Sequence, residues 1–210
     1  NHELWVLGDE GGDGDGPTDS VDKFFRVLRL CDELGVHTSP AWVGETLVVP
    51  LFSWYKRTPG ARDAGALEYF DGACRWPWPD VASSLDDAVA DFFLALNEGA
   101  LDYVDRHRSD APVLSFSHFV PRVGALFPGF AAFRHVMGCP ELDAQLARLA
   151  PRVHGFGHSH INVDELIDGT RYVQRALGHP SDGVSLDNDR AGPLLVWCSV
   201  ESEAFAGNFM

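Results

Sequence analysis

Residues 112–118 read PVLSFSH, an apolar run that predicts a buried strand ending at His118. Residues 153–160 read VHGFGHSH and repeat this arrangement, because a short predicted strand again leads into histidines. Residues 140–149, between the two segments, carry apolar side chains at helical spacing. Strands and helices alternate elsewhere along the chain as well, which predicts an α/β fold.

The remaining patterned segments support the same fold class. A helix is predicted from Ser20 to Gly35. Residues 46–52 read as a buried strand, in which Pro50 indicates an edge or a bulge because proline lacks a ladder donor. A further helix is predicted from Ser84. Five of its apolar residues should form the inner face: Val89, Phe92, Phe93, Leu96 and Leu101.

No internal repeat or linker divides the sequence, so we predict one domain over residues 1–210. Residues 8–20 read GDEGGDGDGPTDS and lack any large apolar side chain, which predicts a flexible acidic loop. Residues 58–80 show no sustained periodicity. We interpret Trp76 and Trp78 in that stretch as packing beneath an irregular loop.

Composition restricts the classes of partner. The formal net charge of −15 would repel nucleic-acid backbones and anionic membranes, so we expect neither general nucleic-acid binding nor membrane binding. The chain lacks a long apolar run and a signal-peptide pattern, which favours a cytoplasmic location. The four cysteines lack CxxC spacing, which indicates mostly buried thiols and no zinc knuckle or disulfide framework.

Three histidine-containing elements follow one another along the chain: Asn1-His2-Glu3, Ser117-His118 and Gly157-His158-Ser159-His160. Composition alone would produce Gly-His-x-His about 0.04 times and Asn-His-Glu about 0.01 times, so the ordered set is not accidental. If the last element is extended, His158 and His160 face one side about 6–7 Å apart. That spacing would suit one ligand for each of two metal ions about 3.5–4 Å apart.

These elements resemble the third, fourth and fifth motifs of the calcineurin-like metallophosphoesterases. Three segments are similar to a plant and algal branch of that superfamily: FSHFVPR at residues 116–122, PLFSWY at 50–55 and FGHSHINVDELIDGTRYVQ at 156–174. The resemblance spans nearly the whole chain. It implies an αββα sandwich and a metal-dependent hydrolase that acts on a phosphomonoester or a phosphodiester.

The resemblance also implies roles for individual residues. Asn1, His118 and His158 would be ligands of one metal ion, and His160 would be a ligand of the other. His2 would be the general acid that stabilises the leaving group. Imidazole nitrogens and an amide oxygen bind manganese, iron or zinc without cancelling the metal charge, so two such ions could activate a bridging water.

Other polar residues have two interpretations each. Glu3 could orient His2 or make a structural hydrogen bond. Arg122, four residues after His118, could bind a substrate phosphate or pair with a carboxylate. His154 reads as a satisfied core residue.

The Asp-x-His and Gly-Asp elements of the family have no counterpart, because Gly8-Asp9 follows Asn-His-Glu when it should precede it. We therefore expect an N-terminally truncated fragment with an incomplete sandwich and exposed apolar edges, inactive by itself. The complete enzyme would act on a phosphorylated small molecule or a phosphoprotein. The alternative is a non-catalytic binding module.

Overall fold

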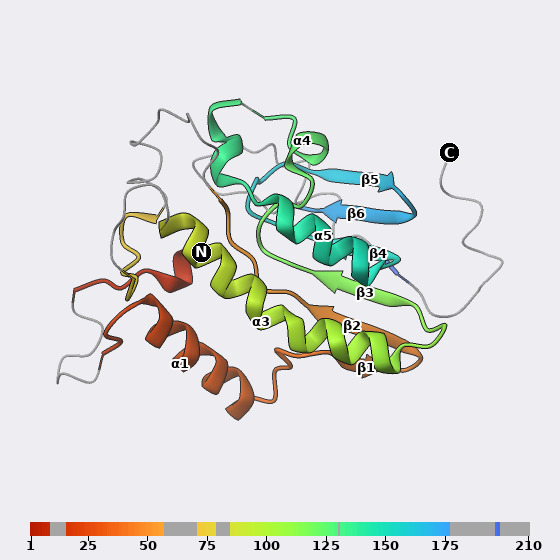
Figure 1. Ribbon diagram of the computed structural model, residues 1–210, viewed down its shortest axis with the longest axis horizontal. Helices are drawn as coiled ribbons and strands as arrows, with labels where there is room; N and C mark the ends of the chain where they lie inside the picture. Colours follow the sequence, from red (N-terminus) through yellow and green to blue (C-terminus); the bar gives the residue numbers. More distant parts are fainter. Residues whose placement is uncertain (9–15, 57–70, 79–84, 130, 177–195, 198–210) are drawn as a thin grey trace.

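The computed structural model describes residues 1–8, 16–56, 71–78, 85–129, 131–176 and 196–197. These residues form a mixed α/β fold around one six-stranded sheet of order β1-β2-β3-β4-β6-β5 (Figure 1). The inner strands are mutually parallel, whereas β1 and β5 add antiparallel edges. The strands are Ala41–Val43 (β1), Thr46–Pro50 (β2), Val113–Phe116 (β3), Val153–Gly155 (β4), Val163–Ile167 (β5) and Thr170–Gln174 (β6).

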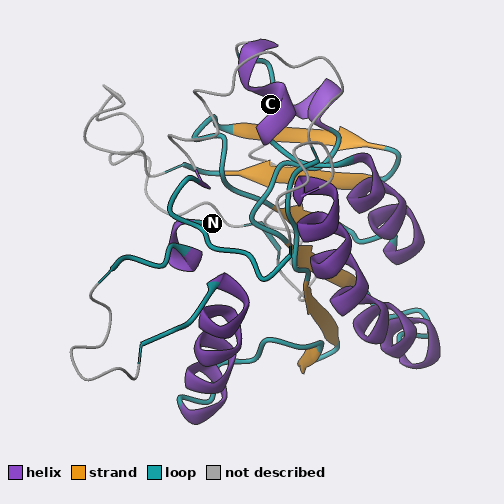
Figure 2. Ribbon diagram, turned by 60° about the vertical axis from the view of Figure 1, so that its left-hand side comes forward, coloured by secondary structure: helices purple, strands orange, loops and turns teal. Residues whose placement is uncertain are grey.

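Helices α3 and α5 lie side by side over one face of the sheet (Figures 1 and 2). Helix α1 contacts the N-terminal half of α3 through aromatic rings, with Phe24 and Phe93 5.2 Å apart between ring centroids. The helices are His2–Leu4 (η1), Ser20–Glu33 (α1), Leu85–His107 (α3), Val123–Leu126 (α4), Ala131–Val136 (η2) and Pro140–Leu149 (α5). None of these described helices is long and apolar enough to cross a bilayer. A second sheet, as a sandwich would require, is not among the described residues.

Apolar side chains are exposed at the β1 edge and at the end of β3. Trp42 and Val43 of β1 are 43% and 64% exposed, and Phe116 of β3 is 48% exposed. Trp42 and Val43 thus expose apolar surface at one edge of the sheet, and the absence of further strands from the fold stays a prediction.

Helix α1 begins differently from the sequence interpretation. Asp19 caps the helix, because its side chain accepts hydrogen bonds from the backbone of the first turn. Ser20 is fully buried instead, and its hydroxyl donates to Leu4 O at 2.7 Å and accepts from Arg75 N at 2.8 Å. The Ser20 hydroxyl at the start of α1 thus connects η1 with residues 71–78. Of the predicted acidic loop, residues 9–15 lie outside the described part.

Strand β2 is an inner strand, but the expectation of an edge at Pro50 is met locally, because β1 does not extend to this position. The N–H groups of Leu47 and Leu51 donate toward β3. Successive backbone nitrogens of a strand point to opposite sides, so the nitrogen of Pro50 points toward the β1 side. Strand β1 pairs only with residues 46–48 of β2. The missing donor of Pro50 therefore lies on a side of β2 where no described strand pairs with it.

The inner face of α3 was predicted correctly except at Leu96, which is 36% exposed. The buried stripe runs through Asn97, which is 1% exposed. Its Oδ1 accepts from Phe52 N, and its Nδ2 donates to Phe52 O and to Gln145 Oε1, each at 2.8 Å. A buried amide therefore links α3 to the chain after β2 and to α5, a role that apolar periodicity does not reveal.

Asn97→Ala is expected to lower the free energy of unfolding by about 2 kcal/mol, because it leaves the buried polar groups of Phe52 and Gln145 without partners. Urea denaturation measures this loss. Leu96→Ala, on the exposed side of the same helix, is the control and should cost less than about 1 kcal/mol. Equal losses in the two variants would show that the buried amide contributes nothing specific.

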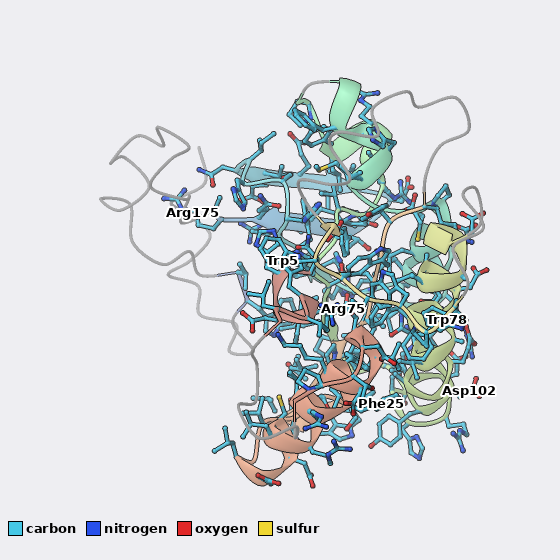
Figure 3. All side chains as sticks on the ribbon, turned by 90° about the vertical axis from the view of Figure 1, so that its left-hand side faces the viewer. Trp5, Phe25, Arg75, Trp78, Asp102 and Arg175 are labelled. Carbon is cyan, nitrogen blue, oxygen red and sulfur yellow. The ribbon has the colours of Figure 1, made fainter. Side chains whose placement is uncertain are left out.

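The two tryptophans of residues 71–78 pack against the core, as predicted. Trp76 lies 5.2 Å from Trp54, and Trp78 lies 5.4 Å from Phe92 of α3, between ring centroids. Figure 3 shows Trp78 beside α3. Residues 58–70 and 79–80 of the same predicted excursion lie outside the described part.

The described cysteines are free thiols of mixed burial. Cys139 is buried, whereas Cys31 and Cys74 are half-buried. Burial raises the pKa of Cys139 to about 11 and that of Cys74 to about 12. The expectation of mostly buried thiols is thus met in full only at Cys139, and Cys198 lies outside the described residues.

Candidate metal centre

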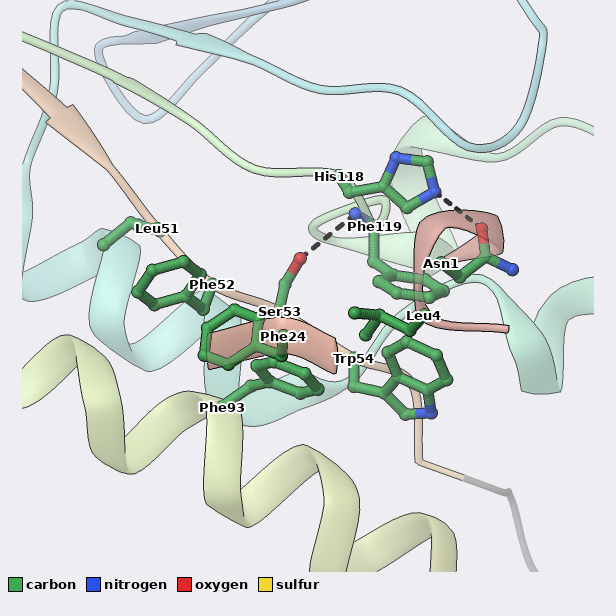
Figure 4. A pocket seen from close by; sticks show the side chains of 10 residues that line it. All are labelled: Asn1, Leu4, Phe24, Leu51, Phe52, Ser53, Trp54, Phe93, His118 and Phe119. Carbon is green, nitrogen blue, oxygen red and sulfur yellow. Dashed lines mark hydrogen bonds between the residues drawn. The ribbon is translucent and has the colours of Figure 1, made fainter. Parts of the chain in front are cut away.

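Three of the four predicted metal ligands meet beyond the carboxyl ends of β3 and β4. Nε2 of His118 lies 3.0 Å from Oδ1 of Asn1 and 3.2 Å from Nδ1 of His158. His118 follows β3 and His158 follows β4, and these neighbouring strands are parallel, so both histidines emerge at one edge of the sheet. Asn1 reaches them from the start of η1, and Figure 4 shows its contact with His118.

The tautomer of His158 follows from its backbone contact. Nε2 lies 3.0 Å from the carbonyl oxygen of Val136, which can only accept, so Nε2 carries the hydrogen. Burial, followed by the charge of the Asn1 α-amino group, lowers the pKa of His158 to about 3. The ring is therefore neutral, and Nδ1 directs a lone pair toward His118. A ligand histidine is typically held in this way by its other nitrogen.

His118 is also neutral: part of its side chain is exposed, but desolvation of the ring by the surrounding chain lowers its pKa to about 2. Its Nε2 faces two acceptors, Asn1 Oδ1 and His158 Nδ1, and must carry the only hydrogen between the three atoms. The three atoms can each offer a lone pair to one point once that hydrogen moves to Nδ1 of His118. Three lone pairs that point to one position favour the binding of a cation there.

The spacing of the three atoms agrees with coordination. With metal–ligand bonds of about 2.1 Å, ligand atoms lie about 3.0 Å apart at a right angle and about 3.4 Å apart at a tetrahedral angle. The two separations from Nε2 of His118, 3.0 Å to Asn1 Oδ1 and 3.2 Å to His158 Nδ1, fall in this range. Asn1, His118 and His158 therefore fit one metal ion in position and chemistry.

His2 and His160, the other predicted site histidines, are both exposed. A charge on either one lowers the pKa values of His118 and His158, so both lie within electrostatic range of the trio. Although His2 is exposed, the part of its ring that the chain covers is desolvated, and this desolvation is the main cause that lowers its pKa. Its ring lies 4.4 Å from that of Trp5.

The segment that carries His158 and His160 is a turn, which corrects the expectation of an extended chain. Both residues have left-handed backbones, with φ of 67° and 55°, and Ser159 N–H donates to Gly157 O at 2.8 Å. Simple alternation therefore does not set the spacing of the two rings. A non-glycine residue in this region costs about 1–3 kcal/mol, and such strain concentrates at functional sites.

Arg122 lies against a carboxylate, which is the second of its two interpretations. Its Nη2 is 2.7 Å from Oδ2 of Asp168, and its guanidinium carbon lies 5.8 Å from the ring centre of Tyr172. A role in phosphate binding stays a prediction. Glu3 is exposed on η1, and its charge has a minor raising effect on the pKa of His2.

The described donor set is small. Within the described ranges, no group of three or more His, Cys, Asp or Glu side chains is placed to hold a metal. The trio reaches three donors only because the Asn1 amide supplies one of them. Asp9, from the element that mimics the Gly-Asp motif, lies outside the described residues.

Asp71 belongs to this site and was not identified from the sequence. Its Oδ1 accepts a hydrogen bond of 2.9 Å from Asn1 Nδ2. Asp71 lies in the stretch 58–80, which lacks periodicity, and 70 positions separate it from its partner. No local pattern in the sequence could have indicated this pairing.

His154, at the centre of β4, holds the end of β3 in place. The Ser117 hydroxyl donates to Phe119 O at 3.0 Å, so it accepts from His154 Nε2–H at 3.1 Å, and His154 Nδ1 then accepts from Ser115 at 2.8 Å. His154 is fully buried, and burial lowers its pKa to about 3. The prediction of a satisfied core histidine is confirmed, and its network includes the residue before His118.

A cavity of about 190 Å³ lies beside the trio (Figure 4). Its wall includes two of the three ligand residues, and most of the rest is apolar. The lining residues are Asn1, Leu4, Phe24, Leu51, Phe52, Ser53, Trp54, Phe93, His118 and Phe119. The candidate metal position thus borders an aromatic pocket.

Comparison with known proteins identifies a hydrolase with a similar fold. No protein-family model matches the sequence, and no curated protein matches it. The crystal structure of phosphopantetheinyl hydrolase (PptH) from Mycobacterium tuberculosis is similar, with a TM-score of 0.64 and 22% identity over 91% of this chain and 70% of that chain. At this identity the likeness shows the fold alone. A second solved structure, with a TM-score of 0.42 and 16% identity over 77% of this chain and 54% of that one, carries no argument.

Proposed function

We propose that Asn1, His118 and His158 hold a divalent metal ion in a hydrolase that cleaves a phosphomonoester or a phosphodiester. The observation that carries the proposal is the convergence of three lone-pair donors at ligand spacing, with a single hydrogen between them. The fold that the chain shares with a phosphopantetheinyl hydrolase supports the reaction class. We also propose that the chain belongs to the calcineurin-like superfamily, which its sequence motifs support.

We assign each residue of the site a role in this hydrolysis. Bound manganese, iron or zinc would polarise a phosphoryl oxygen and lower the pKa of an attacking water. His158 is held by Val136, so its Nδ1 stays aimed at the ion. His2 is exposed and titratable, and it would donate a proton to the departing alkoxide. His160 would hold the second ion of a complete site.

The substrate would carry an apolar group next to its phosphate. The cavity beside Asn1 and His118 measures about 190 Å³ and is lined mainly by aromatic rings. An apolar cavity of about 150 Å³ accommodates benzene, so this one has room for a group of that size. A phosphorylated small molecule or a phosphoprotein side chain could present such a group.

A second candidate function is a binding module that holds one ion without turnover. It is favoured by the donor set, which among the described residues includes no carboxylate placed between two metal positions. Three neutral donors hold an ion more weakly than a set that includes charged ligands.

Calorimetric titration with Mn²⁺ and assays with para-nitrophenyl phosphate and its bis ester test these proposals. We expect one Mn²⁺ per chain and almost no turnover by the 210-residue chain, because one filled position is insufficient for two-metal catalysis. The longest natural polypeptide that contains these residues should be active. Absence of Mn²⁺, Fe²⁺ and Zn²⁺ binding at millimolar concentrations would contradict the metal site, and binding without turnover in the longest polypeptide would favour the module.

A further inference from the structure

Asp71 is the acidic residue in contact with the candidate metal ligand Asn1. Its Oδ1 accepts from Asn1 Nδ2 at 2.9 Å. Its other oxygen, Oδ2, is buried and has no hydrogen-bond partner in the described part of the chain. Val6 N–H donates to Ala73 O at 2.9 Å, so the segment of Asp71 is also tied to the chain start through its backbone. The contact therefore belongs to the packing between two segments.

A carboxamide must be correctly oriented to bind a cation. Its oxygen offers lone pairs, whereas its nitrogen offers only hydrogens, so a rotation of 180° would present the wrong group to a metal. Asp71 can only accept when ionised, and it therefore requires Nδ2 on its side. Oδ1 of Asn1 is then directed to the other side, where it lies 3.0 Å from His118 Nε2.

We propose that Asp71 is a positioning residue, which fixes the Asn1 carboxamide so that Oδ1 faces the ion held by His118 and His158. The ion itself rests on the proposed function, whereas the orientation of the amide does not. The unpartnered Oδ2 adds a negative charge beside a trio of neutral donors. That charge attracts a cation to a site in which Coulomb attraction is otherwise weak.

The orientation can be tested without metal. In the metal-free chain, ¹⁵N-resolved spectra of the histidine rings should show His118 in the Nε2–H tautomer, because Nε2 faces the acceptors Asn1 Oδ1 and His158 Nδ1. In Asp71→Ala the amide is free to turn and present Nδ2, which removes one of these two acceptors, so the His118 ring signals should shift. Unchanged ring signals in Asp71→Ala would overturn the proposal.

Metal affinity gives the second test. Mn²⁺ binding by Asp71→Ala should be at least about 10-fold weaker, the usual effect of losing the partner of a ligand. Two double variants then separate the positioning hydrogen bond from the charge of Asp71: N1D/D71N keeps a hydrogen bond with its direction reversed, and N1D/D71A lacks it. N1D/D71N should bind Mn²⁺ at least about threefold more tightly than N1D/D71A.

The outcomes are distinguishable. Equal affinities of the two double variants would overturn the role of Asp71, and they remain comparable if Asp71→Ala fails to fold. A shift of the His118 ring signals in Asp71→Ala together with no metal binding by the wild-type chain would uphold the orientation and contradict the proposed function. Thermal unfolding of each variant verifies that the fold is intact.

Discussion

His158→Ala is expected to weaken Mn²⁺ binding by more than about 100-fold and to abolish metal-dependent phosphoesterase activity in the longest natural polypeptide. Loss of a residue that only orients a ligand already costs about 10–100-fold, and His158 would be a ligand itself. The substitution removes Nδ1, one of three converging donors. No neighbouring side chain of the described trio can replace it, because Asn1 and His118 already point to the same position.

Calorimetry with Mn²⁺ measures this effect, and His37→Ala provides a matched control. His37 is exposed and follows the C-terminal end of α1, so its removal takes one imidazole from the surface without touching the trio. The control should bind Mn²⁺ as the wild type does. Unchanged Mn²⁺ affinity in His158→Ala would show that the three atoms meet for a structural reason alone.

His154→Ala is expected to lower the free energy of unfolding by about 4 kcal/mol. The substitution opens a cavity under the sheet, and a large-to-small change in a core costs about 2–5 kcal/mol. It also leaves the buried hydroxyls of Ser115 and Ser117 short of a partner. Urea denaturation at neutral pH measures the loss, for which His107→Ala on the exposed end of α3 is the control.

His154 should also make the fold sensitive to acid. Its pKa is about 3 in the folded chain and about 6.5 in an unfolded one, so the unfolded state binds more protons between these values. The contribution of the neutral ring is complete above about pH 6.5 and is lost as the pH falls toward 3, with an upper limit of roughly 4–5 kcal/mol.

The slope of stability against pH tests this contribution. His118 and His158 also have lowered pKa values, so the whole chain should lose stability in acid. A His154→Asn variant should lose less stability than the wild type between pH 7 and pH 4, because its amide does not titrate. Identical losses in both proteins would contradict the assignment to His154.

The sequence by itself determined most of the regular elements and the approach of two ligands. Helix α5 and strand β4 agree with the predicted segments because their apolar periodicity is local and strong. His118 and His158 could be placed together from the sequence, because each follows a strand and parallel neighbours end at one edge of a sheet. Their separation of 40 positions did not matter for that inference.

Only the tertiary structure decided which groups the polar side chains of the site and the core form hydrogen bonds with. The Val136 carbonyl that fixes His158, the carboxylate of Asp71 that faces Asn1 and the place of Asn97 in the α3 stripe have no local signature. The turn that carries His158 and His160 is another such case, because residues other than glycine adopt left-handed backbones only where the surrounding structure holds them there. A periodic pattern specifies which face of an element is buried, but the identity of a polar partner depends on how distant segments pack, and no pattern along the chain encodes that.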